Sequence, residues 1–304
     1  MHEEIHTVKK QPLFYVPTGL ILAFLFSVNT ATGAAAPPQQ AIADPAGLVR
    51  RAVANEVKSN NDNVSMMFQV RKQSPKSGVQ TRRYIETKDG TAGILVANND
   101  QPLTPEQHQQ ELARLDHLLQ NPAELRRKQK QQKEDSVRVM NMLKALPDAF
   151  VYTYDGTTTS NDGDELVRLA FRPNPDYEPP SREQQVFTGM NGFLLVDADK
   201  ERIARIDGTL FKDVSFGWGI LGHLDKGGKF IVVQGPVGKG YWTTTHMQLS
   251  FNGKALFFKT ITIQETEDTS SFHQVPNNLT YAQGVELLKK GDQVVAENGG
   301  GGQK

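Results

Sequence analysis

The chain of 304 residues contains no cysteine. This absence excludes disulfides, thiolate metal sites, thiol nucleophiles and an acylated lipoprotein cysteine. A secreted domain without disulfides must be stable through its core alone, which suits a large β-rich domain better than a small one. The hydrophobic content of 38% is enough for a sizeable core in one large domain or two small ones.

Neither sign of charge is in excess, because 34 Lys and Arg residues balance 34 Asp and Glu residues. The chain therefore has no overall field that would attract nucleic acid or an anionic membrane surface. We expect no nucleic-acid partner and, at most, peripheral contact with a membrane.

Long apolar runs are also scarce, and the one near the N-terminus is short for a bilayer span of about 20 residues. Lys10 precedes this run, 13–28, and the small residues of 31–36 follow it. This order is typical of a cleaved secretory signal peptide, which we predict at residues 1–35. The expected location is the periplasm or the exterior of the cell. Anchoring by an uncleaved N-terminal segment is the alternative.

Residues 187–272 carry most of the aromatic and β-branched residues and are predicted to form antiparallel strands. Turn residues separate apolar runs at 197–200, at 225–228 and at Asn252-Gly253, the strongest hairpin signal of the three. Three hairpins in succession predict a meander.

Outside this region, apolar residues at helical spacing predict an N-terminal helix over 46–59. It leads into an alternating, half-buried strand over 64–70 and a hairpin over 79–97. A short helix is predicted over 281–290. The predicted organisation is a signal peptide (1–35), a linker (36–45), one β domain (46–296) with a helical insert (101–148), and a disordered tail (297–304).

The helical insert differs in composition from its surroundings, being rich in Gln, Leu, Lys and Arg. Thr104 before a proline, with Gln107 following, predicts a capped helix start. Asn121-Pro122 ends this helix, and a second one is predicted to reach about Leu146. The basic run 126–133 suits a solvated face, or a contact for an acidic partner or anionic head group.

No motif in the chain predicts catalysis. The run 235–240 has glycines and a lysine but lacks the spacing and the following helix of a phosphate-binding loop. Asp197 and Asp199 lie in a predicted turn, where aspartate forms local hydrogen bonds. The oxygen-rich loop 161–165 matches no calcium template, and the histidines lack metal-site spacing. We expect no cofactor, no metal and no enzymatic activity, with a triad assembled in space as the open alternative.

Several predicted strands are apolar on both faces, so the sheet needs two covers. Helices can cover one face, and the other is either packed dry or left as a cavity for an apolar ligand. The residues predicted to line such a cavity are Phe193, Leu195, Trp218, Phe230, Val232, Trp242, Met247, Leu249, Phe251, Phe258 and Ile261.

The order of elements resembles the LolA/LolB lipoprotein-carrier superfamily. The likeness rests on 46–70, on 192–197 with 202–206, and on 241–272. It implies an α+β fold whose antiparallel sheet is curved into a half-open β-barrel, with an N-terminal helix and a short C-terminal helix. The helical insert departs from the family, and no functional residue of the family can be placed on this chain.

The resemblance implies that the chain binds an acyl chain or another hydrophobic ligand. Our hypothesis is a periplasmic, non-enzymatic protein that holds a lipid or lipidated protein, with a role in sorting outer-membrane lipoproteins. The first alternative is an envelope stress-sensing or interaction module that holds a protein partner through 104–146. The second is an unrecognised hydrolase.

Overall fold

The computed structural model describes residues 42–59, 64–217, 221–237, 241–255 and 259–299. The fold is α+β, as predicted. The helices are α1 (Pro45–Ser59), α2 (Pro105–Gln120), α3 (Pro122–Ala149), the 3-10 helix η1 (Glu183–Gly189) and α4 (Tyr281–Gly299). The strands are β1 (Ser65–Ser74), β2 (Gly78–Thr87), β3 (Gly90–Asn98), β4 (Gln101–Pro102), β5 (Phe150–Thr159), β6 (Glu165–Pro173), β7 (Met190–Asp197), β8 (Arg202–Leu210), β9 (Val214–Phe216), β10 (Gly222–Leu224), β11 (Lys229–Val237), β12 (Tyr241–Ala255) and β13 (Lys259–Val275).

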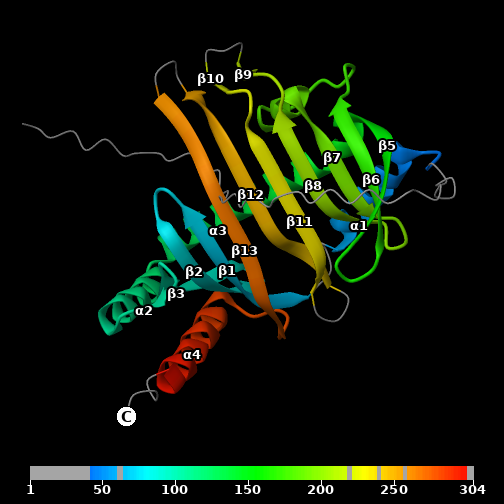
Figure 1. The fold of residues 1–304 in the computed structure, drawn as a ribbon. Helices are drawn as coiled ribbons and strands as arrows, with labels where there is room; N and C mark the ends of the chain where they lie inside the picture. Colours follow the sequence, from blue (N-terminus) through cyan, green and yellow to red (C-terminus); the bar gives the residue numbers. More distant parts are fainter. Residues whose placement is uncertain (1–41, 60–63, 218–220, 238–240, 256–258, 300–304) are drawn as a thin grey trace, which may run out of the picture.

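Among the described residues, thirteen strands form one antiparallel sheet in the order β4-β3-β2-β1-β13-β12-β11-β8-β7-β6-β5, with β9 and β10 beside this path. The sheet stays open, because its two edge strands, β4 and β5, pair with one neighbour each. The long strands β11, β12 and β13 fan out beside β8, β7 and β6, and β1 to β3 lie at an angle to them (Figure 1).

One predicted turn is misplaced, and one predicted hairpin is wrong. Asn252-Gly253 lies inside β12, which continues to Ala255 and pairs there with Lys259. Gly253 is needed for close packing rather than for a turn, since a Cβ at this position would meet the carbonyl oxygen of His223 on β10. The segment before 225–228 is also not the hairpin partner of β11, because β10 pairs with β12 and β9.

Other local predictions are confirmed. Thr104 caps α2 in a capping box with Gln107, and Asn121 separates α2 from α3. β7 and β8 form the hairpin predicted around 197–200. α4 begins at the predicted residue, Tyr281, and continues beyond the predicted end.

The sheet carries a separate hydrophobic core on each face. The first core lies on the face that we call inner, where Leu194 and Leu169 pack against α1 and the end of α3. The strand register places the second core, with Ile85 and Ile94, on the outer face of β2 and β3, under α2 and α4. Figure 1 shows α1 and α3 behind the sheet, and α2 and α4 beside β2 and β3.

α3 connects the two edges of the open sheet, because it follows β4 and α2 and leads directly into β5. In the first half of α3, Gln132 hydrogen-bonds the backbone of Thr91 next to the β2–β3 turn. At its C-terminal end Leu146 and Ala149 are buried in the first core. Between these contacts, residues 133–141 include no buried side chain, and from Met142 onward α3 packs against the first core.

Within the described part of the chain, no helix is both long enough and apolar enough to cross a membrane. The predicted signal peptide lies in residues 1–41, outside the described residues.

Candidate functional site

The candidate site is the inner face of β8, β11, β12 and β13, where apolar side chains lie side by side across the strands. Val232 of β11 pairs with Ile206 on one side and Met247 on the other, so the three side chains form a row. None of the three is fully buried. We call this half-buried set the inner stripe, which comprises Ile206, Phe230, Val232, Met247, Ile261 and Ile263.

Six of the residues predicted to line a cavity lie on the inner face, but they differ in how deeply they are buried. Phe230, Val232, Met247 and Ile261 belong to the inner stripe. Leu249 and Phe251 share this face but are buried in the first core, with 8% and 6% of their surfaces exposed. Sequence alternation therefore grouped these side chains correctly without separating exposed from buried positions.

The other predicted lining residues lie elsewhere or outside the described residues. Phe193 and Leu195 lie on the outer face, since their neighbour Leu194 takes the inner one. The guanidinium of Arg168 covers the Phe193 ring at 3.6 Å. The indole of Trp242 donates a hydrogen bond to the carbonyl oxygen of Ile203, at the start of β8. Trp218 and Phe258 are not among the described residues.

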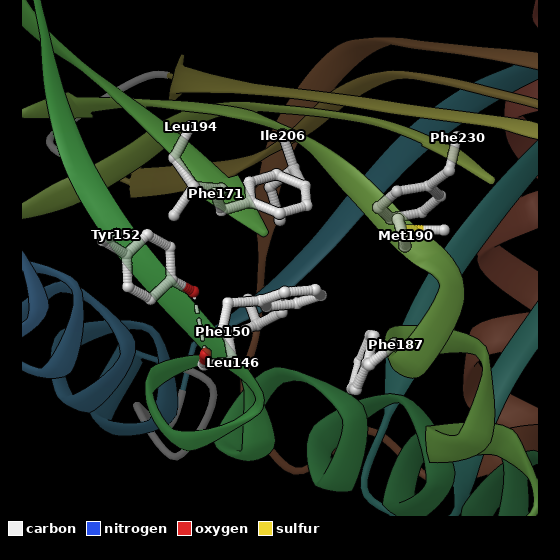
Figure 2. Close-up of a pocket in the computed structure, with 9 residues that line it drawn as sticks. All are labelled: Leu146, Phe150, Tyr152, Phe171, Phe187, Met190, Leu194, Ile206 and Phe230. Atoms are coloured by element: carbon white, nitrogen blue, oxygen red, sulfur yellow. Dashed lines mark hydrogen bonds between the residues drawn. The ribbon is translucent and has the colours of Figure 1, made fainter. Parts of the chain in front are cut away.

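An apolar hollow of about 20 Å³ lies between the inner face and the cover formed by the end of α3 and by η1. Figure 2 shows ring and aliphatic side chains projecting into it from the strands and from this cover. Its lining residues are Leu146, Phe150, Tyr152, Phe171, Phe187, Met190, Leu194, Ile206 and Phe230. Only Phe230 among them was predicted as lining. Alternation along β5 and β6 could have indicated Phe150, Tyr152 and Phe171, but the placement of Leu146 and Phe187 depends on the crossover.

The walls of the apolar hollow are closely packed, and the buried hydroxyl of Tyr152 in them has a hydrogen-bond partner. The Phe150 ring lies 4.6 Å from that of Phe171 and 5.2 Å from that of Phe187, between ring centroids. The Tyr152 hydroxyl donates a 2.8 Å hydrogen bond to the Leu146 carbonyl oxygen, and burial raises its pKa (Figure 2). A volume of this size holds about one water molecule, whereas ligand pockets enclose about 300–1,000 Å³. In this conformation, a ligand larger than a water molecule must therefore bind along the inner stripe or displace the cover.

A second, polar hollow of about 220 Å³ lies between α3 and the segment around η1. Arg138 reaches Asp135 at 2.6 Å and Glu183 at 3.5 Å beside it. The buried Gln184 side chain joins the two segments by donating a 3.0 Å hydrogen bond to the Asn141 carbonyl oxygen. The lining residues are Glu134, Val137, Arg138, Asn141, Met142, Ser181, Glu183 and Gln184.

A buried ion pair fixes α1 over the end of the sheet. Glu56 accepts hydrogen bonds of 2.9 and 3.0 Å from the Arg202 guanidinium, and both side chains are largely buried. Burial raises the pKa of Glu56 even though Arg202 favours its ionised form. This contact positions α1 against β8, next to the first core.

The chemistry-bearing residues considered in the sequence lie away from both hollows. Asp197 is buried and caps its turn by accepting a 2.8 Å hydrogen bond from the Lys200 amide, as predicted. His246 lies 2.7 Å from Asp268, and His223 lies 3.1 Å from Asp225. Neither pair lines a hollow. The described residues include no group of three or more potential metal ligands.

No protein-family model matches the chain, and no curated protein matches it. The chain is similar to the crystal structure of a DUF1329 family protein from Desulfovibrio piger. That match has 14% sequence identity and a TM-score of 0.34, and it covers 79% of this chain and 96% of the other.

Proposed function

We propose that this protein is a non-enzymatic periplasmic carrier or sensor that holds an acyl chain, a lipid or a lipidated protein along its inner stripe. The observation that carries the proposal is the position of the stripe, whose side chains are only half-buried on an open sheet next to the apolar hollow. Burying apolar surface there would contribute about 25 cal/mol per Å². The resemblance to LolA/LolB carriers supports the same ligand class.

The charges at the end of the stripe suit an amphiphilic ligand. Met247 pairs across β12 and β13 with Glu267, and Glu267 pairs with Lys72 of β1. The Lys72 ammonium lies 3.4 Å from the Glu267 carboxylate. The row of inner-face side chains thus changes from apolar to charged, as a ligand with an acyl chain and a polar end requires.

Loading by this route requires movement of the cover. The apolar hollow is too small for an acyl chain, so the end of α3 and η1 would have to separate from the strands. The Gln184 side chain, which donates a hydrogen bond to the Asn141 carbonyl oxygen of α3, lies at the contact that would open. We infer that the structure is the closed conformation of a binding protein.

A matched pair of substitutions on β11 tests the proposal. Val232→Asp places a charge on the inner stripe, while Val233→Asp places the same charge on the outer face, next to Arg205. Both valines are half-buried. In a fluorescence titration with a dansyl-labelled C11 fatty acid, we expect Val232→Asp to bind at least tenfold more weakly than Val233→Asp, because an acyl chain would desolvate the carboxylate.

Mass spectrometry tests the proposal without assuming which ligand is bound. The protein is expressed into a periplasm, purified without detergent and denatured, and the released small molecules are identified. Stoichiometric phospholipid or fatty acid is the expected result. A protein that releases no lipid and binds no probe would rule out the proposal.

A protein-interaction module is the second candidate function, and exposed apolar residues on α3 favour it. Val137 and Val139 are 51% and 69% exposed, and Val137 borders the polar hollow. Under this function, Val137→Lys with Val139→Lys would abolish cross-linking to an envelope protein while leaving probe binding unchanged. These substitutions are preferable to deleting 104–146, because Leu115 and Leu146 in that segment contribute to the two cores.

A further inference from the structure

Three cationic side chains from three elements converge next to the second core. Arg114 of α2 donates hydrogen bonds of 2.7 and 2.8 Å to the two oxygens of Glu111. Arg82 of β2 lies 3.2 Å from the same carboxylate. Lys128 of α3 donates a 3.1 Å hydrogen bond to the hydroxyl of Tyr281 on α4. The cluster therefore holds three formal positive charges near two carboxylates, Glu111 and, beside Lys128, Glu124.

Glu111 is fully engaged by these partners and by the backbone. It is 7% exposed and also accepts a 2.7 Å hydrogen bond from the Leu95 amide. Burial alone would raise its pKa, but the hydrogen bonds from Arg114 and Leu95 outweigh burial, and the pKa is lowered. Its single negative charge is thus present at neutral pH and already shared by two guanidinium groups.

The Lys128 ammonium is the least compensated cation of the cluster. Of its three N–H donors, one meets the Tyr281 hydroxyl, and its other donors have no hydrogen-bond partner within the described part of the chain. Burial, together with the positive charges of Arg114 and Arg82, lowers the pKa of Lys128 to about 8, although Glu111 and Glu124 act in the opposite direction. An anion placed here would relieve the repulsion among the three cations.

The cluster is also reachable from solvent. Arg82 and Arg114 have side chains that are 27% and 40% exposed, and Lys128 is half-buried. Lys130 of the same basic run is far more exposed than Lys128, with 78% of its side-chain surface accessible to solvent. Of these two lysines, Lys128 is therefore the one placed for a specific contact.

We propose that Lys128, Arg82 and Arg114 bind a phosphate-type anion at the junction of β2, α2, α3 and α4. The guanidinium N–H groups that Glu111 and the Gly93 carbonyl do not engage supply charge-assisted donors, and the ammonium supplies a point charge, a combination that proteins use for phosphate oxygens. The anion is either free phosphate or the phosphate of a lipid head group. The proposal is independent of acyl binding at the inner stripe, since this site adjoins the other core.

Sulfate is the first probe, because its charge is constant between pH 7 and pH 9. By isothermal titration calorimetry of the full chain, we expect sulfate binding to weaken by up to about tenfold from pH 7 to pH 9, as Lys128 loses its proton through the pKa of about 8. Lys128→Met should bind at least tenfold more weakly at pH 7 and lose this pH dependence. Lys130→Met is the matched control and should behave as the wild type.

Two further arms separate the sources of the anion. Inorganic phosphate binding in solution without cosedimentation on vesicles would assign a free phosphate. Cosedimentation with phosphatidylglycerol vesicles but not with phosphatidylcholine vesicles, lost in Lys128→Met, would assign a lipid head group. Absence of binding to sulfate, phosphate and both vesicles, or equal binding by Lys128→Met and Lys130→Met, would overturn the proposal. Arg82→Gln serves as the second variant if Lys128→Met does not fold.

Discussion

At the scale of single residues, Glu86 is a half-buried carboxylate on the sheet without an ion-pair partner among the described residues. Its side chain accepts a 2.9 Å hydrogen bond from the Met66 amide. Burial raises its pKa above 4.5 in the folded protein, and the Met66 hydrogen bond only partly opposes this. The ionised form of Glu86 is therefore destabilising in the native state.

We predict that Glu86→Gln stabilises the protein by about 1 kcal/mol at pH 7, because glutamine accepts the same hydrogen bond without a half-buried charge. The folded carboxyl holds its proton to a higher pH than the unfolded one, so its contribution to stability falls as pH rises from 4.5 through the raised pKa. Urea unfolding at pH 4 and pH 7 should show the gain only at pH 7. Glu134→Gln, at a carboxylate that is 51% exposed, should change stability little at either pH.

Residues with a local physical role were predictable from sequence. Asp197 was assigned to a turn because a short carboxylate bonds nearby amides, and it does so with Lys200. Lys128 was only one member of a basic run, since its burial depends on where α4 places Tyr281. Hydrogen bonds between residues close in sequence can be predicted from the sequence. Clusters of charges from distant segments can be recognised only in the tertiary structure.

At the scale of elements, the middle of α3 has no fully buried side chain in 131–142, and its contacts with η1 are polar. Its amides in 131–142 rely on intrahelical hydrogen bonds, while those of 143–149 adjoin buried side chains. By hydrogen–deuterium exchange, we predict that 131–142 exchanges at least tenfold faster than 143–149, because opening the middle exposes little buried surface. Equal protection along α3 would show that something outside the described residues covers its middle.

Helix limits were more predictable than strand pairing for a physical reason. A capping box and an Asn-Pro break act within a few residues, and both ends of α2 followed them. Asn252-Gly253 has the composition of a tight turn, yet pairing with β13 and the close approach of β10 kept it in an extended strand. Pairing and packing with the neighbouring strands overrode the local turn preference there.

At the scale of the whole molecule, the two cores lie on opposite faces of one sheet and are linked by long strands. β1 and β13 pair along most of their length between them. We predict a single unfolding transition, destabilised by about 2–5 kcal/mol by either Leu194→Ala in the first core or Leu288→Ala in the second, since both leucines are almost fully buried. Urea unfolding followed by near- and far-ultraviolet circular dichroism should give coincident curves. Separate transitions would mean that the cores unfold independently.

For the candidate site, the sequence predicts which side chains share a face of the sheet but not which face is the inner one. Period-two alternation correctly grouped Phe230 with Val232 and Phe193 with Leu195. It contains no information on which of the two faces lies beneath α1 and α3, because that depends on the crossover from β4 to β5. One set of predicted residues thus reached the inner stripe and the other reached the outer face.

The pairing of β1 with β13 has a consequence for how the chain is made. Ser65 of β1 pairs with Val275 of β13, so a strand near the start of the fold can complete its pairing only with a strand near the end. Until a ribosome has synthesised nearly the whole chain, β1 lacks one of its two neighbours, and pairing of such distant segments is slow. We therefore expect the centre of the sheet to form only after most of the chain has been synthesised.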